Sequence, residues 1–357
     1  MLKTLGAQIK EFKLPSIITP LCMMLEVVME MIIPLMMASF VDDGIETGNI
    51  KHIYVMGGCM VLAAIVSLSA GFGGGYFGAK ASTGFARNIR EAMFVNIQSF
   101  SFSNIDKFST AGLVTRLTTD VTNLQNAYQM VLRMCIRAPF TLICAMCMSF
   151  FINSRVASIY LIAVILLGGC LFFIASRTMK TFRSIFKKYD ALNGSVQENV
   201  SAIRVVKAYV REDYEVEKFK KESNNLRNLF TKAENVLALN SPLMQFTVYT
   251  CILSISYIGA KLIAAGNMST GNLMSLLTYC MNILSSLMML SMIFVMVTMS
   301  MASAERVCEV LNEKSDLGNP AAPVYEIPDG SIRFDHVSFR YNKDSKESVL
   351  ADINLDI

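Results

Sequence analysis

Charged residues are scarce in this chain, and histidine is nearly absent. Of the 357 residues, 17% are charged and 53% are hydrophobic. A soluble protein of this length carries more charge on its surface, so the composition excludes an ordinary soluble domain. The two histidines, His52 and His336, are too few and too far apart in sequence for a histidine-based metal site. A net charge of +4 is too modest to indicate nucleic-acid binding.

Hydrophobic residues are concentrated in six runs, each long enough to cross a bilayer, which takes about 20 residues. We therefore predict an all-α polytopic membrane protein with six long helices. Prolines in the first run imply a kink, which neighbouring helices can accommodate in lipid. The predicted spans are residues 14–41, 52–79, 132–151, 156–176, 236–265 and 271–301.

The distribution of positive charge predicts the topology. Lys and Arg are frequent in the N-terminal lead, in the two long polar segments after the second and fourth spans, and after the sixth span. The turn at residues 42–46 is acidic instead. Because positive residues mark cytoplasmic segments, we expect both termini in the cytoplasm and the acidic turn outside the plasma (inner) membrane.

One polar stretch, residues 195–214, lies between apolar runs. Its apolar residues recur at three- and four-residue steps, at Val196, Val200, Ile203, Val206 and Val210. This spacing predicts one amphipathic helix followed by a break. In the other polar segment, residues 101–110 are rich in turn- and cap-forming types. We interpret that segment as a helix, a short crossing segment and a second helix.

The composition changes after the sixth span. We assign residues 1–312 to the membrane domain and the Pro- and Gly-rich residues 313–330 to a linker. Residues 331–341 and 349–357 alternate like strands, with a change of phase between Phe334 and Val337. Two strands do not make a stable domain, so we expect residues 331–357 to be the leading edge of a longer one.

Four motifs occur in order along the chain. Residues 113–120 read LVTRLTTD, residues 203–209 read IRVVKAY followed by Glu212, residues 304–307 read AERV, and residues 334–341 read FDHVSFRY. Together they resemble the half-transporters of the ABC exporter family. That family carries L-I-x-R-L-T-x-D, I-R-V-V-K-A-F-x-x-E-E, A-x-x-R-I and F-x-x-V-x-F-x-Y in the same order. Residues 100–126 look most like halves of heterodimeric bacterial multidrug exporters.

The resemblance implies the type 1 transmembrane fold of ABC transporters, with helices that extend into the cytoplasm and two coupling-helix excursions. Tyr341 matches the aromatic residue that stacks on adenine, and a base offers a π face for such stacking. The first coupling helix would lie within residues 103–110 and the second within residues 209–214, where it would dock on the partner's ATP-binding domain. The implied coupling residues are Ser103, Asn104, Asp106, Lys107, Phe108, Tyr209, Arg211, Glu212 and Tyr214.

The chain departs from the family in one respect. The phosphate loop G-x-x-x-x-G-K-[ST], which holds nucleotide phosphates and magnesium, does not occur in the sequence. We therefore expect a fragment of a longer protein. ATP and magnesium would be bound by the full-length protein, an ATP-hydrolysing translocase, and not competently by these residues alone.

The resemblance predicts the transmembrane half of an ATP-driven exporter that works by alternating access. Its cargo would be a lipophilic, multidrug-like, lipid or peptide molecule. The expected partners are membrane lipid, a small-molecule substrate and a second half-transporter, in a heterodimer rather than a homodimer, and no nucleic acid. The alternative is an ATP-independent membrane transporter or scaffold, which would need neither the long cytoplasmic helices nor the strands.

Polar residues inside the spans are candidates for a substrate cavity. Glu26 and Glu30 lie four residues apart on one helix face. They either form a cavity wall or cation site, or pair with Arg133 or Arg137. In the methionine-rich sixth span, a substrate-facing stripe would consist of Asn282, Ser285 and Ser286. Two further patterns favour packing over chemistry. They are the glycine cluster at residues 71–78, where helices approach closely, and the Arg116–Asp120 pair, a solvated helix pair or a contact between helices.

Overall fold

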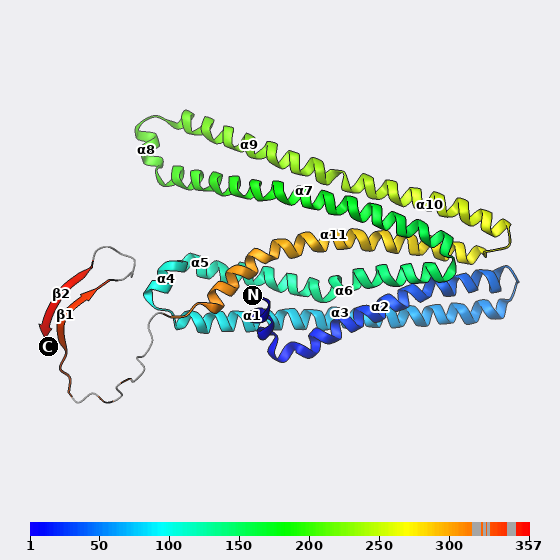
Figure 1. Cartoon of the computed structure of the whole chain (residues 1–357), viewed down its shortest axis with the longest axis horizontal. Helices are drawn as coiled ribbons and strands as arrows, with labels where there is room; N and C mark the ends of the chain where they lie inside the picture. Colours follow the sequence, from blue (N-terminus) through cyan, green and yellow to red (C-terminus); the bar gives the residue numbers. More distant parts are fainter. Residues whose placement is uncertain (316–322, 324–325, 327–328, 341–347) are drawn as a thin grey trace. The chain divides into compact units, whose positions relative to one another are not determined.

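The computed structural model describes residues 1–315, 323, 326, 329–340 and 348–357. Long helices make up most of this part, and a two-stranded sheet follows them (Figure 1). The chain divides into two compact units. The first comprises Met1–Thr19, Gly75–Leu132 and Met296–Ile357, and the second comprises Pro20–Gly74 and Arg133–Val295.

The helices alternate between long spans and short connecting elements. The long ones are α2 (Lys13–Ser39), α3 (Ile50–Gln98), α6 (Val121–Ile152), α7 (Ser154–Ser201), α9 (Glu212–Ala238), α10 (Asn240–Ala264) and α11 (Thr270–Asn312). The short ones are α1 (Leu2–Gly6), α4 (Phe102–Phe108), α5 (Thr110–Thr115) and α8 (Ile203–Ala208). The remaining helical turns are η1 (Ala7–Phe12), η2 (Phe40–Ile45) and η3 (Arg116–Asp120).

Six helical segments of the described part are long and apolar enough to cross a membrane. Each predicted span lies within one of them, except that the fifth ends one residue later, at Ala265, so the prediction of six long membrane helices is confirmed. The segments are Leu2–Ile45, Ile50–Gln98, Thr110–Ile152, Ser154–Thr178, Glu212–Ala264 and Thr270–Asn312.

Hydrogen bonds from tyrosine and serine side chains tie α11 to its neighbours in the core of the second unit. The fully buried Tyr160 of α7 donates its hydroxyl to the carbonyl oxygen of Leu276, at 2.7 Å. Tyr279 donates in the same way to the carbonyl oxygen of Met31, at 2.6 Å. Pro34 interrupts the backbone hydrogen bonds of α2, and the hydroxyl of Ser275 on α11 donates to its carbonyl oxygen. A neighbouring helix thus supports the proline site, as expected in lipid.

The glycine cluster brings α2 and α3 close together in the second unit. A Cβ atom added at Gly71 would lie 3.2 Å from the carboxyl carbon of Glu26. One added at Gly73 would lie 3.3 Å from Sγ of Cys22. Few real Cβ atoms make such close contacts, so a side chain at either position would push its neighbour on α2 away by a few tenths of an ångström. The interpretation of the cluster as a close-packing site is confirmed.

The core of the first unit consists of buried apolar residues of α3, α6 and α11, together with the chain's first residues. Ile89, Val121 and Val307 are fully buried there. Gly84 of α3 packs directly on the ring of Phe12, where a Cβ atom would overlap the ring carbons. The N-terminal lead is therefore seated on this core.

The two strands, β1 (Arg333–Phe339) and β2 (Leu350–Asp356), pair antiparallel. The register shifts between Phe334 and Val337, so a β-bulge lies where the sequence alternation changes phase, and it shifts again between Val337 and Phe339. Most side chains of both strands are exposed.

Candidate functional site

The first predicted coupling segment forms the seven-residue helix α4. Asn104 forms a capping box at its start, because its side-chain oxygen accepts hydrogen bonds from the backbone N–H of Ser101, at 3.1 Å, and from the hydroxyl of Ser101, at 2.7 Å. The hydroxyls of Ser101 and Ser103 lie 2.9 Å apart. A crossing helix is thus confirmed at this place, beginning at Phe102.

The predicted coupling residues of α4 differ in exposure. Asp106 and Lys107 are exposed, whereas Asn104 and Phe108 are buried. The Phe108 ring stacks on Phe100 with centroids 5.9 Å apart. Asn104 and Phe108 therefore hold α4 in the first unit, and Asp106 and Lys107 are the two charged residues of α4 that it presents to solvent.

Two side chains of α4 bind the carboxylate of Glu313, the first residue after α11. Lys107 Nζ lies 2.8 Å from its Oε2 atom, and Asn104 Nδ2 donates to its Oε1 atom, also at 2.8 Å. The ammonium group of Lys107 holds the pKa of Glu313 below its usual range, because it stabilises the ionised carboxylate. The root of the predicted linker is thereby bound to the first predicted coupling helix.

A second polar contact joins η3, the helical turn before α6, to α11 in the same unit. Arg306 Nε donates to Asp120 Oδ2 at 2.7 Å, and Nη2 donates to Oδ1 at 2.5 Å. The Asp120 side chain is only 2% exposed. Arg116 reaches α11 separately, with Nη1 2.8 Å from Glu309 Oε2. Of the two interpretations of Arg116 and Asp120, the contact between helices is confirmed.

The stretch at residues 195–214 is not one helix followed by a break. Helix α7 ends at Ser201, Ala202 leaves the helical conformation with φ −96° and ψ 15°, and α8 follows as a separate six-residue helix. Helices α7 and α9 run side by side, and α8 lies at the turn between them (Figure 1). The crossing helix therefore lies at Ile203–Ala208, ahead of the predicted residues 209–214.

The residues predicted for the second coupling helix form the turn after α8 and the first turn of α9. Tyr209 and Tyr214 are 76% and 58% exposed, so both rings are available to another molecule. The guanidinium carbon of Arg211 lies 5.9 Å from the Tyr214 ring centroid. Glu212 is bound within the turn, since Lys207 Nζ lies 3.1 Å from its Oε1 atom.

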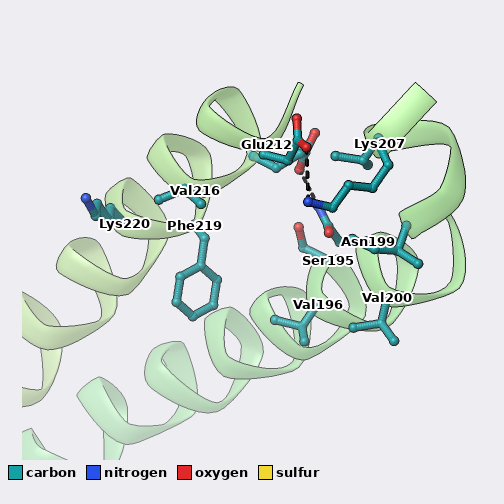
Figure 2. Close-up of a pocket in the computed structure, with 12 residues that line it drawn as sticks. Ser195, Val196, Asn199, Val200, Lys207, Glu212, Val216, Phe219 and Lys220 are labelled. Carbon is teal, nitrogen blue, oxygen red and sulfur yellow. Dashed lines mark hydrogen bonds and ion pairs between the residues drawn. The ribbon is translucent and has the colours of Figure 1, made fainter. Parts of the chain in front are cut away.

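Helices α7, α8 and α9 enclose a hollow of about 600 Å³ (Figure 2). Its apolar walls come from all three helices, with Val200 on α7, Val206 on α8 and Phe219 on α9. Polar bridges close its rim. Asn199 Nδ2 donates to Glu215 Oε2 at 2.8 Å, next to the Lys207–Glu212 pair. Apolar contacts and polar bridges from α7 and α9 therefore hold α8 in place.

Glu26 and Glu30 of α2 share one arginine of α6. Arg137 Nη1 lies 2.7 Å from Glu26 Oε1, and Nη2 lies 2.7 Å from Glu30 Oε1. The ion-pair interpretation is therefore confirmed, with Arg137 as the partner. Glu30 is 36% exposed and Arg137 is 29% exposed, whereas Glu26 is 14% exposed. One side of this triad is accessible, so a role as a cavity wall stays a prediction.

The other predicted positions have separate outcomes. On α11, Ser285 is exposed, but Ser286 is buried and donates its hydroxyl to the Asn282 carbonyl oxygen at 2.7 Å. Only part of the predicted stripe is therefore accessible in the second unit, and its role stays a prediction. Tyr341 lies outside the described residues.

Glu313 and Arg306 are the positions whose contacts the sequence reasoning missed. Glu313 stands in a Pro- and Gly-rich segment, and its partners on α4 lie more than 200 residues away in sequence. The motif at residues 304–307 includes Arg306, but it gives no indication that Asp120 is the partner of this residue.

Comparison with known proteins agrees with this geometry. Residues 16–288 match the ABC transporter transmembrane region. The chain therefore belongs to this family and is a multi-pass membrane protein. The resemblance to the transmembrane half of ABC exporters is confirmed, as is the all-α fold with a small sheet after it.

Curated relatives extend the match. The chain is 30% identical over 341 residues to the uncharacterized ABC transporter ATP-binding protein YfiB of Bacillus subtilis (strain 168), covering 96% of this chain and 59% of that protein. It is 26% identical over 291 residues to the protein YknU of the same strain, covering 81% of this chain and 49% of YknU. An ATP-dependent lipid A-core flippase of Desulfotalea psychrophila is 27% identical over 280 residues, covering 76% of this chain and 47% of the flippase. The chain thus spans about half to three fifths of these relatives.

Proposed function

We propose that this chain forms the transmembrane half of an ATP-driven exporter that moves a lipophilic, lipid or peptide molecule across the plasma membrane by alternating access. The observation that carries the proposal is the pair of short helices, α4 and α8, each at the turn of an excursion between apolar spans. A membrane channel or scaffold needs no such helices. They give a nucleotide-driven domain a surface through which to move the membrane helices.

The chain's contribution is mechanical. We assign ATP and magnesium to an ATP-binding domain, to which β1, β2 and Tyr341 would belong, because the relative YfiB is named as an ATP-binding protein. ATP supplies the driving force there. The exposed residues around α8 transmit it, because aromatic anchors such as Tyr209 carry much of the energy of an interface.

We also propose the orientation and the partner. The positive charge of both excursions supports a cytoplasmic location for α4, α8 and both termini. Exposed apolar residues on α9, among them Val216 and Phe219, lie outside the most apolar part of the chain and favour a second half-transporter as a neighbour. Resemblance in residues 100–126 favours a heterodimer.

The triad of Glu26, Glu30 and Arg137 is the proposed polar element of the substrate pathway. In the full-length exporter, Glu26→Gln with Glu30→Gln should change transport rate or substrate range, whereas the exposed Glu91→Gln should change neither. The double variant also leaves Arg137 without its ion pairs, so folding is measured in parallel. Normal transport together with normal stability would remove the triad from the pathway.

A coupling experiment tests the proposed function. Tyr209→Ala with Tyr214→Ala, in the full-length protein with its partner, should leave nucleotide binding intact. It should abolish substrate-stimulated ATP hydrolysis and transport into vesicles. Tyr189→Ala, an exposed tyrosine elsewhere on α7, is the matched control. Transport by the parent without ATP would favour the alternative, an ATP-independent transporter, and undiminished stimulation in the double variant would refute the coupling role.

A further inference from the structure

Asn104 is placed to connect two parts of the first unit. Its amide oxygen accepts hydrogen bonds from the backbone N–H and the hydroxyl of Ser101 at the start of α4. Its amide nitrogen donates to Glu313 Oε1 at 2.8 Å and to the carbonyl oxygen of Lys314 at 3.2 Å. The residue is buried, with 5% of its surface exposed. One side chain therefore fixes the start of α4 and also binds the two residues that follow α11.

Glu313 completes this connection from the other side. Its carboxylate is 19% exposed and uses both oxygens, one for Asn104 and one for Lys107. A single exposed ion pair contributes little, and Lys107 is 61% exposed. Here the same carboxylate also accepts a hydrogen bond from a buried amide, and networks of this kind are stronger than an isolated pair.

Capping of α11 does not account for these contacts. The end of that helix is already capped by Asn96, whose Nδ2 atom donates to the carbonyl oxygens of Val310 at 2.7 Å and Glu313 at 2.9 Å. Such bonds satisfy the free carbonyls of a helix end. Asn104 and Lys107 bind the side chain of Glu313 instead, which a cap does not require. The side-chain contacts serve to join α4 to the segment after α11.

From these contacts we infer that Asn104, Lys107 and Glu313 form a clasp that couples the first crossing helix to the root of the chain's own linker. The clasp residues are positioning residues. They set the position of α4 relative to the segment after α11, so a movement of that segment is transmitted to α4 through these hydrogen bonds as well as through surface contact. This inference rests on the proposed function for its role in transport, but the clasp itself is a property of the first unit.

Hydrogen exchange of α4 tests the clasp without any activity. In the full-length protein, Glu313→Ala should speed the exchange of α4 amides by about tenfold, since it removes two charge-assisted hydrogen bonds. Glu305→Ala, an exposed carboxylate two turns earlier on α11, should leave the exchange unchanged. Lys107→Glu and Glu313→Lys should each act like Glu313→Ala. The double exchange of charges should recover only part of the protection, because it restores the ion pair but leaves Asn104 Nδ2 without its carboxylate acceptor.

Substrate-stimulated ATP hydrolysis tests the role of the clasp. Stimulation should fall about tenfold in Glu313→Ala, while basal hydrolysis and substrate binding stay near those of the parent. Unchanged exchange of α4 in Glu313→Ala, or faster exchange with full stimulation, would overturn the inference. A parent that hydrolyses no ATP and transports nothing would instead refute the proposed function, and the exchange measurement would still decide whether the clasp exists.

Discussion

The pair of Asp120 and Arg306 offers a sharp test of what stabilises the first unit. The Asp120 carboxylate is 2% exposed and accepts two hydrogen bonds from Arg306, whereas the Arg306 side chain is 45% exposed. The two ends of the contact are therefore not equivalent. Truncating the arginine leaves a charge buried, while truncating the aspartate leaves a charge that water can reach.

The expected magnitudes follow from this asymmetry. Removing one partner of a buried ion pair costs about 3–5 kcal/mol, and Arg306→Met should fall near about 3 because water can enter beside the half-exposed site. Asp120→Leu should cost about 1.5–3 kcal/mol, the range for lost hydrogen bonds to a charged group. Glu309→Gln is the control. Glu309 is 56% exposed, and Arg116 keeps its hydrogen bond to the carbonyl oxygen of Arg306, so the cost should stay below about 1 kcal/mol.

The assay is denaturant unfolding of the full-length protein in detergent, for both single variants, their combination and the control. Replacing both members of a buried pair by apolar residues is often neutral, so the combined variant should lie within about 1 kcal/mol of the parent. The effects of Asp120→Leu and Arg306→Met would then be strongly non-additive. A combined variant as unstable as the sum of the two, or an Arg306→Met variant as stable as the parent, would refute the reasoning.

Two further predictions concern the same unit. Gly84→Ala should destabilise the protein by about 1–3 kcal/mol in the same assay, because the new methyl group would overlap the Phe12 ring. Gly57→Ala, which meets nothing within 4 Å, should not destabilise it. The second concerns pH: the contact with Lys107 lowers the pKa of Glu313, so its stabilising effect is complete above the pKa of the unfolded chain and is lost as pH falls through the folded pKa. Protection of α4 should therefore fall in the parent, but not in Glu313→Ala, as pH drops below the ordinary glutamate pKa of about 4.3, and equal acid responses would contradict the assignment.

The parts of this fold that the sequence predicted are those with a local cause. The spans follow from apolar runs of bilayer length, and α4 follows from the cap-forming residues around Ser101. The bulge between Phe334 and Val337 follows from an interrupted alternation. The clasp at Glu313 could not be predicted from neighbouring residues, because its partners are brought to it by the folding of the whole unit.

The break at Ala202 went unpredicted for a different reason. No glycine or proline marks it, and Val200, Ile203 and Val206 keep the helical period across it. All three line the hollow between α7, α8 and α9. A chain that bends around a shared apolar hollow must return its apolar residues to the same place, as a straight amphipathic helix does. Apolar spacing therefore reports which side chains face the hollow and not whether the helix axis continues, so the break and the position of α8 require the structure.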